Sequence, residues 1–308
     1  MTESYKEYAF EEYIETYLLL NGGYTQIPQE GEYSRELTLF PKEVIRFIRE
    51  SQPETWDKLE AQLGVDTEQA IIDALIKFLD SEEHSSLDVI RHGFKVYGKT
   101  IKMAFFKPAF GLNPRTLELY GMNRVGISRQ VHFSTDNDKS VDLVLSLNGI
   151  PVATAELKNQ MTGQSVEEGK NQYRFTRDPN EKLFQFKKRA LVHFVVDTDD
   201  VFMTTKLEGK DTYFLPFNIG YKNGAGNPPE AGKHRTHYLW ESVWERDSWL
   251  DILARFIHLQ IDEKKVGKRT VKKEKMIFPR YHQLDAVRKL EAAAREEGRV
   301  ITESCVWR

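Results

Sequence analysis

The chain has 308 residues, which is enough for one large domain or two ordinary ones, and 40% of them are hydrophobic. The 44 Lys and Arg residues against 47 Asp and Glu residues give a net charge of -3. Overall charge therefore gives no sign of nucleic-acid binding, and a DNA enzyme with this balance must concentrate its basic residues on one face.

Cysteine usage and hydropathy predict the compartment. Cys305 is the single cysteine, which excludes a disulfide framework and a cysteine-based zinc site and fits a reducing cytoplasm. The first residues lack the basic and apolar stretches of a signal peptide, and no apolar run approaches the ~18 residues needed to cross a bilayer. We therefore expect a cytoplasmic protein that does not contact a membrane.

The first half of the chain begins with helices and changes to strands near residue 95. Apolar side chains from Phe10 to Leu18 recur at helical spacing, and Asn21-Gly22-Gly23 ends this first helix. Two more helices are predicted at 41–51 and 67–79. Short strands are predicted at 94–96, 101–106, 131–133, 141–147 and 152–157.

The second half alternates between the two kinds of element and ends in a basic run. The predicted elements are helices at 165–174 and 180–189, strands at 191–196 and 201–204, a loop at 218–232, a helix at 247–259 and a helical unit at 279–295. The basic run extends from Lys264 to Lys275. We interpret it as a domain boundary, formed either by a solvated linker or by a contact with DNA phosphates.

The clearest pair of strands carries charged residues at one end. Asp142 alternates with apolar residues along 141–147, and Glu156 and Lys158 share one face of the strand at 152–158. Asn148-Gly149 between the two strands is a strong turn signal. The sequence therefore predicts a β-hairpin that carries these charges.

The register of this hairpin decides whether the charged side chains meet. A two-residue turn would pair Leu147 with Ile150 and leave Asp142 on the opposite face from Glu156. One more turn residue pairs Asp142 with Glu156 instead and gathers the apolar residues on the other face. Because register follows the buried face, we expect an odd-length turn with Gly149 as a left-handed bulge residue.

In that register the two carboxylates lie opposite each other, with Cβ atoms roughly 5 Å apart. Their repulsion is offset well by a divalent cation, and hard oxygen ligands without Cys or His favour Mg²⁺ or Mn²⁺. Lys158 can hold or help deprotonate an attacking water and can offset charge in the transition state. The alternative is a surface salt bridge on a solvated sheet face, since an Asp followed by Glu-x-Lys is a short pattern.

The motif Asp142…Glu156-Leu157-Lys158 resembles the core of the PD-(D/E)xK nucleases. The chain around it resembles the N-terminal endonuclease region of the motor subunits of type I restriction enzymes. The matching segments are Phe10-Glu11-Glu12-Tyr13-Ile14, Gly22-Gly23-Tyr24, Phe106-Lys107-Pro108-Ala109, Leu112-Asn113-Pro114, residues 184–194 and Leu215-Pro216-Phe217-Asn218. The resemblance implies an α/β fold with a mixed central sheet, the hairpin at its centre and helices on both sides.

The same resemblance implies roles for individual residues. Asp142, Glu156 and the main-chain carbonyl of Leu157 would ligate the metal, and Lys158 would be the catalytic lysine. A Glu on the first helix often completes such sites. Glu11 borders the apolar stripe of that helix and is the candidate, with an ordinary exposed Glu as the alternative.

Related nucleases also carry a Gln-x-x-x-Tyr motif on the helix after the lysine strand. Gln172 has a suitable position here, but Thr176 occupies the place of the Tyr. Tyr173 or Phe175 would then stand in as the motif or DNA-contact residue, and Gln172 could equally cap or solvate its helix.

Other residues have mainly structural interpretations. Lys170, Arg174 and Arg177 either line a DNA groove or face solvent. His193 lies inside an apolar strand and is expected to be a satisfied core histidine. Trp240, Trp244 and Trp249 are expected to pack in the core.

The C-terminal segment 278–287 resembles the adenine-reading segment that opens superfamily 2 helicase motors, in which Gln283 would read the adenine edge. The chain contains no GxxxxGK[ST] loop, so the ATP site cannot form in it, and we expect a motor that is cut short. The predicted division is an endonuclease domain at 1–262, a basic linker at 263–277 and the start of a helicase domain at 278–308.

The sequence therefore predicts Mg²⁺-dependent hydrolysis of double-stranded DNA, with Mn²⁺ able to replace Mg²⁺. The resemblance implies modification and specificity subunits as partners, 5′-phosphate and 3′-hydroxyl ends, and ATP-driven translocation by the full-length subunit only. Two alternatives stay open: a self-standing repair or defence nuclease, and a non-catalytic assembly or DNA-binding module.

Overall fold

A mixed β-sheet forms the centre of the molecule. The computed structural model describes residues 3–108, 113–159, 163–266 and 269–305. Within these residues the seven-stranded sheet has the order β1 (Thr25–Gln26), β4 (Val125–His132), β5 (Ser140–Leu147), β6 (Ile150–Leu157), β7 (Val192–Val196), β8 (Val201–Thr204) and β9 (Leu215–Pro216). The pairs β1–β4 and β6–β7 are parallel and the other pairs are antiparallel. The predicted α/β class, with the hairpin at the centre of a mixed sheet, is confirmed.

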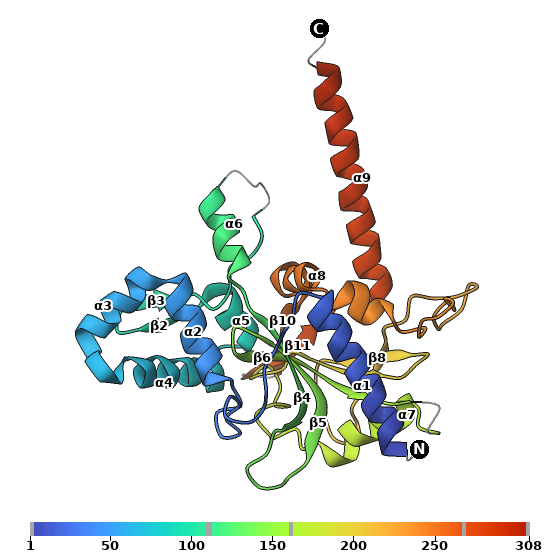
Figure 1. Cartoon of the computed structure of the whole chain (residues 1–308), viewed down its shortest axis with the longest axis horizontal. Coiled ribbons are helices and arrows are strands. Elements are labelled where there is room, and N and C mark those ends of the chain that lie inside the picture. Colours follow the sequence, from blue (N-terminus) through green and yellow to red (C-terminus); the bar gives the residue numbers. More distant parts are fainter. Residues whose placement is uncertain (1–2, 109–112, 160–162, 267–268, 306–308) are drawn as a thin grey trace.

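Helices flank this sheet (Figure 1). α1 (Glu3–Leu20) buries Phe10, Ile14 and Leu18 in the main apolar core. α7 (Val166–Asn171) packs against β6 and β7 so closely that a Cβ on Gly169 would lie 2.5 Å from the side chain of Val195. α7 continues directly into a π-helix, η3 (Gln172–Thr176). The segment after the lysine strand is therefore held tightly on the sheet.

A largely helical lobe lies to one side of the sheet, on the left in Figure 1. Its elements are α2 (Pro41–Ser51), α3 (Pro53–Leu63), η1 (Gly64–Asp66), α4 (Thr67–Asp80), α5 (Ser86–His92), β2 (Phe94–Val96) and β3 (Lys99–Ile101). Apolar residues of α2, α4, α5 and both strands join the same core as the hairpin. α6 (Pro114–Gly121) follows the lobe and stands apart from it in Figure 1.

The C-terminal third contributes buried residues to the core and ends in a long helix that extends away from it. Its elements are η4 (Leu239–Val243), α8 (Arg246–Asp251), η5 (Ile252–Phe256), β10 (His258–Val266), β11 (Arg269–Ile277) and α9 (Tyr281–Cys305). Trp240, Trp244 and Trp249 are fully buried, which confirms their predicted core role. α9 projects away from the rest of the molecule (Figure 1). Among the described residues, no helix combines the length and apolarity that crossing a membrane requires.

The helix predicted at 180–189 is wrong, because the segment consists of turns. Its basic side chains bind main-chain carbonyls elsewhere: Nζ of Lys188 donates to the carbonyl of Ser81 at 2.6 Å, and Nη2 of Arg189 donates to that of Leu37 at 2.9 Å. Lys187 has a left-handed φ of 62°. These cations satisfy main-chain carbonyls just after α4 and before α2, and a regular helix would turn them away from those carbonyls.

Four further boundaries differ from the prediction. The strand predicted at 101–106 ends at Ile101, because Gln52 and Asn123 bind the main chain that follows. The strand predicted at 131–133 is the end of the longer β4. The helix predicted at 247–259 ends at Phe256, after which β10 begins. The described residues of the basic run predicted as a linker, on either side of 267 and 268, belong to the paired strands β10 and β11.

A few predicted features lie outside the described residues. Ala109 and Leu112 belong to two of the segments that match the family, and Lys268 belongs to the basic run. Each falls in one of the gaps between the described ranges.

Candidate active site at the β5–β6 hairpin

The β5–β6 turn differs from the prediction. It contains only Asn148 and Gly149, whose φ values of 50° and 87° are both left-handed, and Leu147 pairs with Ile150. The odd-length turn is therefore wrong. The physical reason is local: the Asn148 side chain accepts from the N–H of Arg124 at 2.7 Å, which fixes the tight turn against β4.

Asp142 nevertheless lies opposite Glu156 as predicted, further from the turn. The register of the two strands shifts by one residue at a bulge next to Pro151. Proline has no N–H for the ladder, so the pairing is easily interrupted there. Beyond the bulge Leu143 pairs with Ala155, which places Asp142 opposite Glu156. The two carboxylates therefore share a face, as the buried apolar residues on the other face demand.

Asp142 and Lys158 lie side by side at this end of the hairpin. Oδ2 of Asp142 accepts from the N–H of Leu157 at 2.7 Å, and Nζ of Lys158 lies 3.8 Å from the same oxygen. Asp142 is 9% exposed and Lys158 is 4% exposed. The main-chain N–H orients the carboxylate and Lys158 adds a positive charge beside it.

Glu156 is fully buried, and its two oxygens have different surroundings. Oε1 accepts from Nε of Arg177 at 2.7 Å, whereas Oε2 has no hydrogen-bond partner in the described part of the chain. Burial and then the negative charge of Asp142 raise the pKa of Glu156 to about 8, although Arg177 acts in the opposite direction. A buried carboxylate oxygen without a donor is costly, so this oxygen is placed to receive a cation or a proton.

Arg177 holds Glu156 in place. It follows the π-helix η3, its Nη2 donates to the carbonyl of Ser140 at 2.7 Å, and it is almost fully buried. Neither a DNA groove nor exposure to solvent, the two interpretations from the sequence, describes this position. The sequence gives no signal for it, because the pairing joins residues 21 positions apart.

Glu11 of α1 lies next to the hairpin carboxylates. It is 3% exposed, so the alternative of an ordinary exposed Glu is wrong. Nε2 of Gln130 donates to Oε1 of Glu11 at 2.8 Å and to Oδ1 of Asp142 at 3.4 Å, and thus links the two acids. Burial and then the charge of Asp142 raise the pKa of Glu11 to about 7. Arg129 also contacts Glu11, at 3.3 Å.

Gln130 is a site residue that sequence reasoning missed. The flanking pairs Arg129–Leu143 and Val131–Val141 place it opposite Asp142 in the β4–β5 ladder. Its φ of 48° is left-handed, which is strained for a residue other than glycine and is typical of functional sites. No pattern in the sequence distinguishes this Gln from any other polar strand residue.

The helical motif residues have separate environments. Gln172 begins the π-helix η3, and its Oε1 is buried without a partner among the described residues. Tyr173 is fully buried and its hydroxyl lies 2.7 Å from that of Thr154, so it is a core residue and not a surface that DNA can reach. His193 lies 2.8 Å from the same Thr154 hydroxyl, which confirms the predicted satisfied core histidine. Phe175 is exposed.

The donors at the hairpin fit a hard divalent cation. Two carboxylates share a buried face, one oxygen has no partner, and no Cys or His is among them. Among the described residues, no group of three or more His, Cys, Asp or Glu side chains is arranged to hold a metal ion. The carbonyl of Leu157 would therefore have to join Asp142 and Glu156, while Glu11 is held by Gln130 and Arg129.

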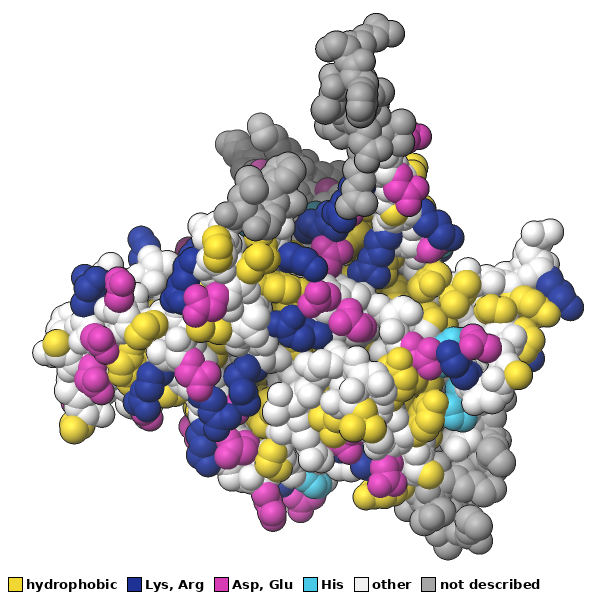
Figure 2. Space-filling model, turned by 45° about the horizontal axis from the view of Figure 1, so that its top comes forward, with side chains coloured by type: hydrophobic (Ala, Val, Ile, Leu, Met, Phe, Trp, Pro, Cys, Tyr) yellow, Lys and Arg dark blue, Asp and Glu magenta, His cyan; other side chains and the backbone are white. Residues whose placement is uncertain are grey.

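Two other predicted features concern nucleic acid and nucleotide. On the face shown in Figure 2, basic and acidic side chains are interspersed, so this face does not show the concentrated basic surface expected of a DNA enzyme. Oε1 of Gln283 accepts from the N–H of Arg280 at 2.9 Å at the start of α9, which uses its carbonyl as a helix cap.

Comparison with known proteins agrees with this geometry. A search of curated proteins found no match. The family described as the type I restriction enzyme R protein N terminus matches residues 5–212, which include most of α1, the hairpin, Arg177 and β7. The match covers well over half of the chain, and the protein belongs to the family of type I restriction enzyme R protein N termini.

Proposed function

We propose that this chain is a divalent-metal-dependent DNA endonuclease module with its active site at Asp142, Glu156 and Lys158. The family assigns it to a restriction system. The observation that supports the chemistry is the buried Oε2 of Glu156, which has no partner among the described residues and belongs to the face shared with Asp142 and Lys158. A purely structural salt bridge would pair both oxygens of a buried Glu.

The residues of the hairpin would bind the metal ion, and their neighbours would orient them. Asp142, Glu156 and the Leu157 carbonyl would hold Mg²⁺ or Mn²⁺. When bound, that ion supplies positive charge beside the scissile phosphate and acidifies water. The N–H of Leu157 orients Asp142, and Arg177 fixes one oxygen of Glu156 and leaves the other available.

Lys158 acts directly on the substrate in this proposal. Its ammonium group lies on the same face as both carboxylates and is largely excluded from water. In such a site it orients the attacking water and stabilises the negative charge that develops on the phosphate oxygens. The substrate is double-stranded DNA. The setting is a complex with modification and specificity subunits.

The test is nicking of supercoiled plasmid by the whole 308-residue chain with Mg²⁺ or Mn²⁺. Lys158→Ala should lower the rate by roughly 100-fold or more, the typical effect of removing a charge-stabilising donor. Lys139→Ala is the matched control, because Lys139 is exposed near the start of β5, and its rate should be unchanged. Equal rates for the two variants, or no metal-dependent nicking by the unaltered chain, would favour a non-catalytic assembly module.

A further inference from the structure

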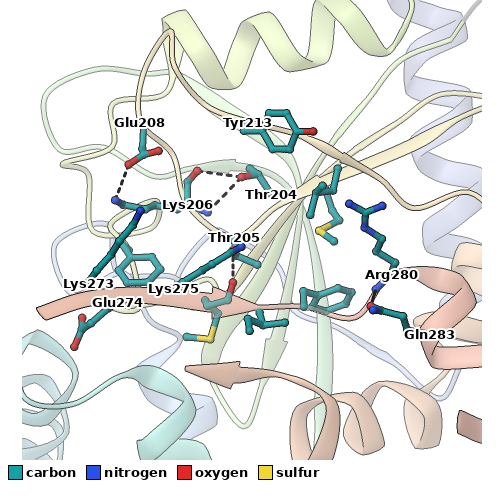
Figure 3. Close-up of a pocket in the computed structure, with 16 residues that line it drawn as sticks. Thr204, Thr205, Lys206, Glu208, Tyr213, Lys273, Glu274, Lys275, Arg280 and Gln283 are labelled. Atoms are coloured by element: carbon teal, nitrogen blue, oxygen red, sulfur yellow. Dashed lines mark hydrogen bonds and ion pairs between the residues drawn. The ribbon is translucent and has the colours of Figure 1, made fainter. Parts of the chain in front are cut away.

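A pocket of about 620 Å³ lies at the C-terminal end of β8. Figure 3 shows the residues that line it. The loop that follows β8, the strand β11 and the start of α9 enclose it. Thr204 on its wall pairs with His193, whereas Val201 at the other end of β8 pairs with Val196, the neighbour of Leu157. On β6, two strands away from β8, Glu156 is level with Phe202, whereas the pocket extends from Met203 and Thr204 onward. The hairpin carboxylates do not line the pocket.

The floor of the pocket is apolar and its rim carries an aromatic ring. Met203, Met276 and Phe278 line it and are buried in the main core. Tyr213 stands over the pocket in Figure 3 and is 73% exposed. An exposed ring above an apolar floor is suited to a flat, weakly polar group such as a nucleic-acid base.

The walls of the pocket carry an excess of positive charge. Its two carboxylates are already paired, because Glu208 binds Lys206 at 2.6 Å and Glu274 binds Lys187. The remaining cations are Lys273, Lys275 and Arg280.

These three side chains have no ion-pair partner in the described ranges. Lys273 and Lys275 share one face of β11 because they are two residues apart, and Arg280 approaches from another side (Figure 3). Three unpaired cations around an apolar floor are suited to phosphate groups joined to bases.

We propose that this pocket binds a short stretch of single-stranded DNA, with its phosphates against Lys273, Lys275 and Arg280 and a base against Tyr213. The proposal rests on the proposed function only in taking the strand to be DNA. A single strand fits better than a duplex, because paired bases present no free face to Tyr213. The volume is in the range of ~300–1,000 Å³ typical of ligand pockets, so it suits one or two nucleotides and not a whole duplex.

The experiment measures binding of a fluorescent 15-nucleotide oligothymidylate to the whole chain by anisotropy. EDTA is present throughout, so that the readout is independent of metal and of cutting. The pocket variant combines Lys273→Gln with Lys275→Gln, because a carboxylate at 273 would oppose Asp262 across the β10–β11 ladder. The matched control combines Lys95→Gln with Lys99→Gln, two exposed lysines on the β2–β3 hairpin.

The pocket variant should bind the strand at least fivefold more weakly at low salt, and the control should bind it within twofold of the unaltered chain. The slope of log K against log salt should fall by about 1.4, since each phosphate contact with a single strand contributes ~0.7. Tyr213→Ala should also weaken binding, whereas Tyr213→Phe, which keeps the ring, should not. Unchanged binding by the pocket variant, or equal losses in the pocket and control variants, would overturn the proposal.

Two further arms separate this proposal from the nuclease proposal and from a different ligand. Asp142→Ala should bind the strand normally, and the pocket variant should still bind Mn²⁺. Loss of strand binding in the pocket variant would thus support the pocket even if no DNA were cut. Free adenine nucleotides are added as competitors of the labelled strand. If they displace it at lower concentration than unlabelled oligothymidylate does, the pocket is a mononucleotide site and the proposal is overturned.

Discussion

The two faces of the β5–β6 hairpin are equally buried but are filled by opposite chemistry. On one face Leu143, Leu145 and Ala155 join the main apolar core. On the other face Asp142 and Glu156 are buried, and the negative charge of Asp142 raises the pKa of Glu156. The apolar face needs only close packing, whereas the polar face needs a partner for every charge.

Burial alone does not identify a functional site in this hairpin. The side chains of both faces are buried, and the two faces differ only in the chemistry of those side chains. There, a carboxylate oxygen has no partner and the pKa values of Glu11 and Glu156 are raised to about 7 and about 8. Buried groups perturbed in this way cluster at functional sites.

The largest expected effect is at the ion pair that neutralises the polar face. At a pH above about 8, where Glu156 is ionised, Arg177→Gln leaves its buried carboxylate without a partner, and breaking such a pair costs about 3–5 kcal/mol of unfolding free energy. Urea unfolding in EDTA measures this loss. Addition of Mn²⁺ should restore more stability to this variant than to the unaltered chain, because a cation replaces the lost charge.

Arg174→Gln is the matched control for that prediction. Arg174 is on the same π-helix, but its contacts are a long hydrogen bond to the carbonyl of Thr212, at 3.4 Å, and a cation–π contact with Phe214 at 5.5 Å, neither of which involves a buried carboxylate. Its stability should change by less than about 1 kcal/mol. A loss as large as that of Arg177→Gln would show that the π-helix, and not the ion pair, is what the substitution disrupts.

On the apolar face, Leu145→Ala should cost about 3 kcal/mol, because it removes buried methyl groups and leaves a cavity. This loss should be the same with and without Mn²⁺ in urea unfolding, since Leu145 faces away from the carboxylates. If the loss of stability in Leu145→Ala differed with and without Mn²⁺, packing on the apolar face would affect metal binding on the polar face.

The stability of the metal-free protein should depend on pH through Glu156. Its pKa is raised to about 8 in the folded state, so its contribution is complete below the unfolded value near 4.5 and is lost as pH rises through about 8. Glu156 should therefore lower the stability between pH 5 and 8 by at most about 1.4 kcal/mol per pH unit, and Glu11, whose pKa is raised to about 7, should act in the same direction. Glu156→Gln should flatten this slope in denaturant melts. A slope that is unchanged in the variant would assign it to other groups.

The smallest effect is expected at α1. Glu11→Gln should weaken Mn²⁺ binding by a few fold, because Glu11 contributes negative charge close to Asp142 without being placed as a direct ligand. Glu12→Gln, at the exposed neighbouring position, should leave it unchanged. Loss of all binding in Glu11→Gln would mean that Glu11 is itself a ligand once the metal is bound.

Sequence patterns predicted the sheet, the hairpin and the face of the carboxylates, because alternation and burial are local properties. The turn differs from the prediction because either a longer turn or a bulge can shift a register by one residue, and the hairpin has the bulge, next to Pro151. Gln130 and Arg177 escaped prediction because their roles depend on contacts across strands and on a left-handed φ that the sequence does not mark. The same reason applies to residues 180–189, whose cations bind distant carbonyls.

The most direct test of the central claim is titration calorimetry of Mn²⁺ and Mg²⁺ into the unaltered chain, Asp142→Ala and Glu156→Gln, with Asp138→Ala as the exposed control. We expect the unaltered chain and the Asp138→Ala control to bind the metal, and both hairpin variants to have lost this binding. Binding that persists in Asp142→Ala and Glu156→Gln, or none in the unaltered chain, would contradict a metal site at the hairpin.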